Sequence, residues 1–239
     1  MVVKGIIFDK DGTLLDFDGY WLPVTRCVLE DLLKEIKRED IPQKELLCAV
    51  GVMDGKAEIS GSLCCGTYGM VGCDIYSVLS RYGAKITLQE TVDLTIKYFH
   101  EHANKGIMNP TSPSLKATLV ALKEQGIKLA VVTSDDKFVT LKCLETLGIK
   151  DLFDDIFADD GAHPPKPDPY YANEFMKKYG FSQAETLMVG DTFTDVNFAK
   201  NAKIGCVAIA KTLHNRALLE KEVPNVISDM QELLGVLGL

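Results

Sequence analysis

The chain has 239 residues, of which 46% are hydrophobic and 25% charged, and its formal net charge at pH 7 is −8. This composition is typical of a globular protein, and the length suffices for one large domain or two modest ones. An acidic chain lacks the basic face that sequence-independent nucleic-acid binding needs, so that class is excluded. No apolar run approaches the ~20 residues of a membrane-spanning helix.

The seven cysteines favour a reducing compartment. Their number is odd and no C-x-x-C pair occurs, while the adjacent Cys64 and Cys65 are poorly placed to chelate one metal ion. We therefore expect reduced, mostly buried thiols. The N-terminal residues run straight into an apolar segment without the pattern of a signal peptide, which favours a cytoplasmic protein with no membrane partner.

The first predicted element is a β-strand at residues 2–8, an apolar run that stops at Asp9. Asp11 follows two residues later, and Gly12-Thr13 come next. A buried strand holds the side chain at its end rigidly, and open α/β sheets bind ligands at the carboxyl ends of their strands. The two carboxylates are therefore candidates for catalysis or for sharing a metal ion.

A predominantly helical stretch follows this strand. A Gly- and Cys-rich segment at 51–72 reads as a loop, and helical patterns cover roughly residues 22–38, 43–50, 70–82 and 87–104. The segment Asn109-Pro110-Thr111-Ser112-Pro113 has the composition of a hinge. We expect a helical cap domain at 17–105, inserted into a core made of residues 1–16 and 106–239.

From residue 112 onward, apolar runs alternate with helical patterns, the first three of which end at glycines. The runs predict strands at 127–133, 156–158, 186–190 and 205–210, and the patterns predict helices at 114–125, 136–147, 169–179 and 194–202. This alternation is typical of βαβ units. The expected fold class is α/β, with a doubly wound parallel sheet and an inserted α-helical cap.

Four groups of polar residues fit one site in this sheet. They are Asp9 with Asp11, Thr133 with Ser134, Lys166, and Asp191 with Asp195. Three of the groups follow apolar strands, and the carboxyl ends of parallel strands share one edge, so residues far apart in sequence can converge there.

Each residue type suits a step of phosphoryl transfer. Mg²⁺ prefers oxygen ligands, which Asp9, Asp11 (by side chain or carbonyl) and Asp191 could supply. Asp195, one helical turn beyond Asp191, could be a further ligand or could orient the others. Hydroxyl and N–H groups of Thr133 and Ser134 could hold phosphate oxygens, and Lys166 offers a positive charge in a loop stiffened by prolines.

The sequence Asp9-Lys10-Asp11-Gly12-Thr13 resembles the first motif of the haloacid dehalogenase (HAD) superfamily. Thr133, Lys166-Pro167, and Gly190-Asp191 through Asp195 resemble its second, third and fourth motifs, in the family's order. The likeness covers the whole chain and is greatest to phosphoglycolate-phosphatase-like and β-phosphoglucomutase-like members, which have a helical cap after the first motif. One departure is Asp16-Phe17-Asp18, where many relatives have Asp-Ser, and it leaves the substrate open.

This resemblance implies roles for the candidate residues. Asp9 is implied as the nucleophile and Asp11 as the general acid/base, with Mg²⁺ held by Asp9, Asp11 and Asp191. It also implies phosphate binding by Thr133, Ser134 and Lys166. Dehalogenase members typically lack the second aspartate, so Asp11 favours phosphate chemistry.

The expected function is a Mg²⁺-dependent phosphatase acting on a small phosphorylated metabolite, as a monomer or homodimer. A phosphosugar mutase would share the core motifs, since the cap decides whether water or a sugar hydroxyl attacks the phosphoenzyme. A non-catalytic binding protein that retains the fold is the third reading, and missing motif residues would favour it.

Overall fold

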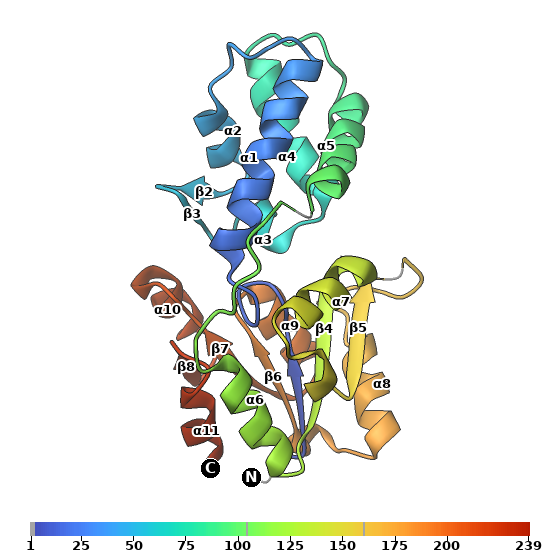
Figure 1. Cartoon of the computed structure of the whole chain (residues 1–239), viewed down its shortest axis with the longest axis vertical. Helices are drawn as coiled ribbons and strands as arrows, with labels where there is room; N and C mark the ends of the chain where they lie inside the picture. Colours follow the sequence, from blue (N-terminus) through green and yellow to red (C-terminus); the bar gives the residue numbers. More distant parts are fainter. Residues whose placement is uncertain (1–2, 104, 160) are drawn as a thin grey trace. The chain divides into compact units, whose positions relative to one another are not determined.

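The computed structural model describes residues 3–103, 105–159 and 161–239 (Figure 1). The chain divides into two compact units, which are described separately. The core unit comprises Met1–Asp16 and Met108–Leu239, and the cap unit comprises Phe17–Ile107. Among the described residues, no helix combines the length and apolarity that crossing a membrane requires.

The core unit contains a six-stranded sheet in which every neighbouring pair of strands is parallel (Figure 1). The strand order is β5 (Asp155–Asp159), β4 (Lys128–Asp136), β1 (Gly5–Phe8), β6 (Thr186–Gly190), β7 (Gly205–Ile209) and β8 (Asn225–Ile227). The predicted α/β fold with a doubly wound parallel sheet is confirmed. The first strand lies inside the sheet, and all four of its residues are buried.

Helices cover both faces of this sheet because successive strand residues point to opposite sides. Ile6 and Phe8 join one apolar cluster with side chains of α6 (Leu115–Glu124), α7 (Lys137–Thr146) and α11 (Glu232–Leu237). Ile7 joins the other with side chains of α8 (Tyr170–Tyr179) and α9 (Phe193–Ala202). The central strand is thus fixed from both sides, which makes its end a rigid place for a functional group.

The cap unit is predominantly helical. Its elements are α1 (Phe17–Glu35), α2 (Gln43–Ala49), a hairpin of β2 (Val52–Met53) and β3 (Lys56–Ala57), α3 (Ser62–Cys65), α4 (Tyr68–Arg81) and α5 (Leu88–His102). The predicted loop at 51–72 is therefore wrong in part. Gly51 explains why the chain can fold back there: a Cβ on it would lie 2.4 Å from the Cα of Gly61.

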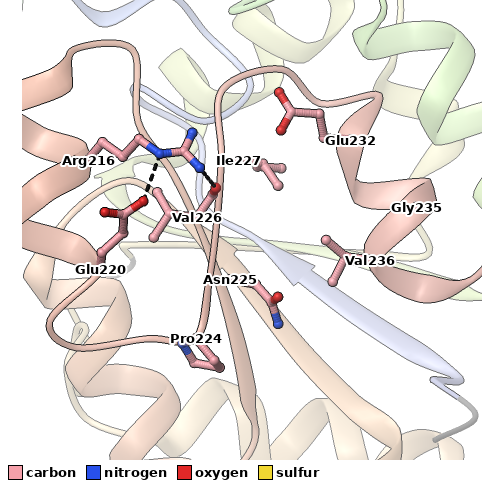
Figure 2. A pocket seen from close by; sticks show the side chains of 9 residues that line it. All are labelled: Arg216, Glu220, Pro224, Asn225, Val226, Ile227, Glu232, Gly235 and Val236. Carbon is pink, nitrogen blue, oxygen red and sulfur yellow. Dashed lines mark hydrogen bonds and ion pairs between the residues drawn. The ribbon is translucent and has the colours of Figure 1, made fainter.

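The sequence analysis did not predict the helices α10 (Leu213–Leu219) and α11 or the edge strand β8. A pocket of about 440 Å³ lies beside β8, with Arg216, Pro224 and Val236 among its lining residues (Figure 2). Arg216 is already paired there, because it donates to Glu220 and to the carbonyl of Val226. None of the candidate site residues lines this pocket.

The described cysteines form no disulfide with one another, and the prediction that most are buried is wrong. Of the seven, Cys143 is buried, Cys27, Cys64 and Cys206 are partly buried, and Cys48, Cys65 and Cys73 are exposed. Most lie in the cap unit, where short helices and loops leave side chains near the surface.

Candidate active site

The candidate residues of three strands meet at one edge of the sheet. Phe8, the last residue of β1, is level with Val131 on β4 and with Val189 on β6. Asp9 therefore leaves the sheet between the strand ends that carry Thr133 and Asp191. This register brings together groups separated by more than a hundred residues of sequence.

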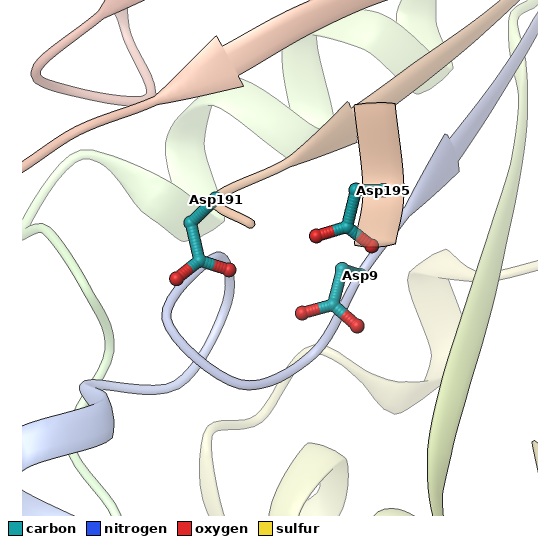
Figure 3. A group of neighbouring side chains, drawn as sticks. All are labelled: Asp9, Asp191 and Asp195. Atoms are coloured by element: carbon teal, nitrogen blue, oxygen red, sulfur yellow. The ribbon is translucent and has the colours of Figure 1, made fainter. Parts of the chain in front are cut away.

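Three carboxylates form a compact group at this edge. One oxygen each of Asp9, Asp191 and Asp195 lies within 4.8 Å of the others, and the three carboxyl groups lie beside one another (Figure 3). Asp9 and Asp195 are buried, while Asp191 is partly exposed. Such a set of hard oxygen donors fits a small divalent cation of the Mg²⁺ type.

Lys166 joins two of these carboxylates. Its ammonium group donates to Asp9 and to Oδ1 of Asp195, the latter at 2.6 Å, and its side chain is only 5% exposed. Burial opposes the charged form of Lys166, but Asp195 and Asp9 outweigh it and raise the pKa of the lysine. The site therefore holds a fixed positive charge beside Asp9.

Asp195 is held from its own helix as well. The backbone N–H and the hydroxyl of Thr192 donate to its Oδ2 at 3.1 and 2.8 Å, in a capping box at the start of α9. A carboxylate in the first turn also interacts favourably with the helix dipole. Asp195 thus contacts both Lys166 and the start of α9, while its predicted role as a further metal ligand or an orienting residue stays a prediction.

Two glycines let the aspartates approach one another. Gly12 has φ +81°, and a Cβ on it would lie 2.0 Å from Oδ2 of Asp191. A Cβ on Gly190 would lie 2.3 Å from the Cβ of Asp195. Thr13 fixes the contact from the same turn, because its hydroxyl donates to Asp191 Oδ1 at 3.2 Å.

Crowding of negative charge alters the acidity of the group. Burial, with smaller contributions from Asp195 and Asp11, raises the pKa of Asp9 to about 7, against the opposing effect of Lys166. Burial followed by the charges of Asp9 and Asp195 raises the pKa of Asp191 well above its usual value. A bound divalent cation would relieve this repulsion, which is a physical reason for the site to take one.

Asp11 lies beside this group, and its side chain is not part of it. Its Oδ1 instead accepts from Lys10 Nζ at 2.6 Å, and Lys10 also lies 3.0 Å from Asp135 Oδ2. The predicted share of Asp11 in metal binding remains a prediction, and the backbone carbonyl is the route that agrees with this placement.

The two predicted phosphate-binding residues of β4 differ in exposure. Thr133 is buried, and its hydroxyl oxygen accepts from the N–H of Asp135 at 3.2 Å. Ser134 is exposed at the end of the same strand. Both lie at the sheet edge that carries Asp9, but their contact with phosphate stays a prediction.

Sequence reasoning missed Lys10, Thr13 and Asp135 as parts of the site. A signal existed for Lys10, since a lysine between two aspartates directly after a buried strand has few ways to reach water. Thr13 was read only as part of a motif. Asp135 follows the predicted Thr133-Ser134 pair, but nothing in the sequence indicates its contact with Lys10.

Comparison with known proteins agrees with this architecture. The family model for haloacid dehalogenase-like hydrolases matches residues 3–203. A phosphoglycolate phosphatase of Vibrio vulnificus is 34% identical, with 98% of this chain and 96% of the relative covered. The pyrophosphatase PpaX of Halalkalibacterium halodurans is 30% identical, with 64% and 70% covered.

A solved structure supports the fold. The Bacillus subtilis HAD hydrolase YfnB, in a form bound to magnesium, superposes with a TM-score of 0.71 at 20% identity, covering 100% of both chains. The family match includes the strand ends that carry Asp9, Thr133 and Asp191, together with the loop of Lys166. This chain belongs to the haloacid dehalogenase-like hydrolase family.

Proposed function

We propose that this enzyme is a Mg²⁺-dependent phosphatase that hydrolyses a small phosphorylated metabolite through a phosphoenzyme formed on Asp9. The observation that carries the proposal is the placement of Asp9, at the buried end of the central strand, against Lys166 and within a group of three carboxylates. The 34% identical relative makes phosphoglycolate the first substrate to test, and the name of PpaX makes pyrophosphate the second.

Magnesium is the cofactor that best fits the donor set. Asp9, Asp191 and Asp195 offer only carboxylate oxygens, and the similar YfnB structure is described as bound to magnesium. When bound, the cation would offset the repulsion between an anionic substrate and an anionic nucleophile. Lys166, buried beside Asp9, adds a positive charge that persists in the absence of metal.

The residues of the chain divide the reaction between them. A carboxylate oxygen of Asp9 attacks phosphorus, an Asp9 O–P bond forms, and the bond from phosphorus to the leaving oxygen breaks. Asp11 gives its proton to the leaving oxygen and later takes one from the water that hydrolyses the phosphoenzyme. Thr133, Ser134 and Lys166 hold the phosphate oxygens during both steps.

Replacing Asp9 by asparagine tests the nucleophile. The Asp9→Asn variant keeps nearly the same volume but loses the anionic oxygen, so release of phosphate should fall by roughly three orders of magnitude or more, as for loss of other covalent nucleophiles. Phosphate release is measured over a panel of small phosphoesters and pyrophosphate with Mg²⁺. The control is Asp151→Asn, at an exposed position outside the site, which should leave turnover unchanged.

Four results of this panel would count against the proposal. Substantial turnover by Asp9→Asn would remove Asp9 as nucleophile, and full activity in excess EDTA would remove the metal requirement. Isomerised sugar phosphate in place of free phosphate would identify a mutase, and no reaction on any substrate would leave a binding protein.

A further inference from the structure

Lys10 is a buried cation that the proposed reaction does not use. It lies between the two aspartates of the first motif, and its side chain has no exposed surface. Its ammonium group is 2.6 Å from Asp11 Oδ1 and 3.0 Å from Asp135 Oδ2. Asp135 is itself a largely buried carboxylate, with 7% of its side chain exposed.

Burying an ammonium group is costly unless carboxylates or other acceptors replace its water shell. The charges of Asp11 and Asp135 outweigh the effect of burial and raise the pKa of Lys10 well above its usual value. The nearby Cys143 adds no negative charge at neutral pH, because burial raises the pKa of this thiol to about 12. The two ion pairs therefore tie Asp11 to Asp135 through Lys10.

The three carboxylates that could hold a metal ion, Asp9, Asp191 and Asp195, are called the metal-type group below. The side chain of Asp11 lies outside it. Asp9, Asp191 and Asp195 come together, while the side chain of Asp11, two residues from Asp9, is paired with Lys10. A proton donor acts efficiently only when its rotamer is held within a small distance of the leaving oxygen. A carboxylate drawn onto a bound cation would lose that position.

Asp135 supplies the fixed end of the tie. It follows Thr133 on β4, its N–H donates to the Thr133 hydroxyl, and β4 pairs with β1 along the length of β1. The ion pairs from Asp135 to Lys10 and from Lys10 to Asp11 thus link the end of a core strand to the side chain that is proposed to transfer the proton.

We propose that Lys10 is a positioning residue. It acts with Asp135 to hold the carboxylate of Asp11 in place as general acid/base and away from the metal-type group. The proposal rests on the phosphatase function proposed above. It makes the lysine inside the first motif a determinant of proton transfer rather than of metal or phosphate binding.

The test uses the dependence of the rate on the leaving group. An alkoxide must receive a proton as it leaves phosphorus, whereas p-nitrophenolate is stable as an anion and needs none. In Lys10→Met, kcat/KM for an alkyl phosphate that the enzyme hydrolyses should fall by about a hundredfold or more, within the range of general acid catalysis. The value for p-nitrophenyl phosphate should fall by less than about fivefold, because attack by Asp9 is retained.

Two further variants keep the test independent of folding. Asp135→Asn keeps the lysine and removes its anchor, so it should show the same selectivity with a smaller loss. Lys10→Met with Asp135→Asn avoids leaving a buried carboxylate unpaired, and it should match Lys10→Met in selectivity. Circular dichroism and thermal unfolding check that each variant is folded.

Lys128→Met is the matched control. Lys128 starts the same strand that ends at Asp136, and it is paired with Asp154 at 2.7 Å. Its removal should leave both kcat/KM values unchanged.

Equal losses on both substrates in the folded variants, or no loss on either, would overturn the role of Lys10. A wild-type enzyme that hydrolyses no phosphoester with Mg²⁺ would instead overturn the proposed phosphatase function. The two failures are therefore distinguishable.

Discussion

Gly12 controls how closely the first motif approaches Asp191. Its φ of +81° lies in the left-handed region, and the space that a Cβ would occupy is taken by the Asp191 carboxylate. The Asp-Gly pair is thus more than a turn signal here. It allows the backbone after Asp11 to pass directly beside a carboxylate of the metal-type group.

Gly12→Ala should separate backbone strain from damage to the site. Alanine in the left-handed region costs about 1–2 kcal/mol of stability, and here it also displaces Asp191. We expect Mg²⁺ to bind at least about tenfold more weakly. Displacing one carboxylate ligand should cost more than about 1.4 kcal/mol of binding free energy, which corresponds to a tenfold change in the dissociation constant. Metal affinity by calorimetry and unfolding by denaturant measure the two effects.

Gly126→Ala is the control for this prediction. Gly126 also has a positive φ, +76°, but nothing lies within 4 Å of the place of its Cβ. It should lose a similar free energy of unfolding and keep its Mg²⁺ affinity. Equal metal affinity in the two variants would show that contact with Asp191 is unimportant.

The acidity of Asp9 predicts how metal binding depends on pH. Because burial raises its pKa to about 7, the metal-free enzyme holds a proton there at lower pH, and a cation must displace it. Mg²⁺ affinity should fall by about fivefold from pH 7 to pH 6, and by up to about tenfold for each further pH unit, because one proton is displaced. Calorimetric titration at pH 8, 7 and 6 measures this, and equal affinity at all three would contradict it.

The raised pKa of Asp9 makes the folding stability of the metal-free enzyme change with pH in the direction opposite to its Mg²⁺ affinity. A carboxyl whose pKa is raised on folding contributes stability below its unfolded value near 4, and this contribution is lost as pH rises through about 7. The metal-free enzyme should therefore gain less stability from pH 5 to pH 8 in the wild type than in Asp9→Asn. Thermal unfolding in EDTA compares the two.

At the scale of elements, the sequence predicts most of what lies in the middle of the sheet. The strand β1, the middle of β4 and most of β6 are apolar because both of their faces are covered, and α6 and α8 are followed by glycines with positive φ. The edge strand β8 and the hairpin of β2 and β3 have two or three residues per strand, too few for a period to show. β8 is defined by its pairing with β7, which lies beyond an intervening helix, and β2 and β3 are defined only by their pairing with each other.

The start of α1 shows how a tertiary contact overrides a local rule. The sequence pattern predicts a helix over roughly residues 22–38. The helix begins at Phe17, and Pro23 leaves the carbonyl of Gly19 without its usual helical donor. The N–H of Ile107, on the returning segment of the cap unit, donates to that carbonyl at 3.3 Å.

The site was predictable to the extent that it follows strand ends. Asp9, Thr133 and Asp191 each come directly after an apolar run, so sheet topology alone places them together. Asp195 follows from helical periodicity after Asp191. The bridge of Lys10 to Asp135 depends on the path of two side chains through the interior, which no spacing rule describes.

At the scale of the whole molecule, the two core segments that flank the cap unit in sequence are hydrogen-bonded to each other. The N–H of Asp16, where the chain leaves the core, donates to the carbonyl of Asn109 at 2.9 Å. On the returning segment, the Thr111 hydroxyl donates to the Thr13 carbonyl at 2.6 Å, and Thr13 in turn binds Asp191. The junction is thus built from core residues and lies next to the metal-type group.

This division predicts that metal stabilises the two units unequally. All three carboxylates of the metal-type group belong to the core unit, so Mg²⁺ at 100 times its dissociation constant should stabilise the core by about 2.7 kcal/mol, slowing exchange through core unfolding roughly a hundredfold. Hydrogen exchange with mass spectrometry should show this in peptides from β1 and β6 and leave α4 and α5 unchanged. Asp191→Asn should abolish the effect. Equal slowing in α4 and α5 would mean that core and cap unfold as one cooperative unit, in which case metal bound at the end of β1 would govern the stability of the whole chain.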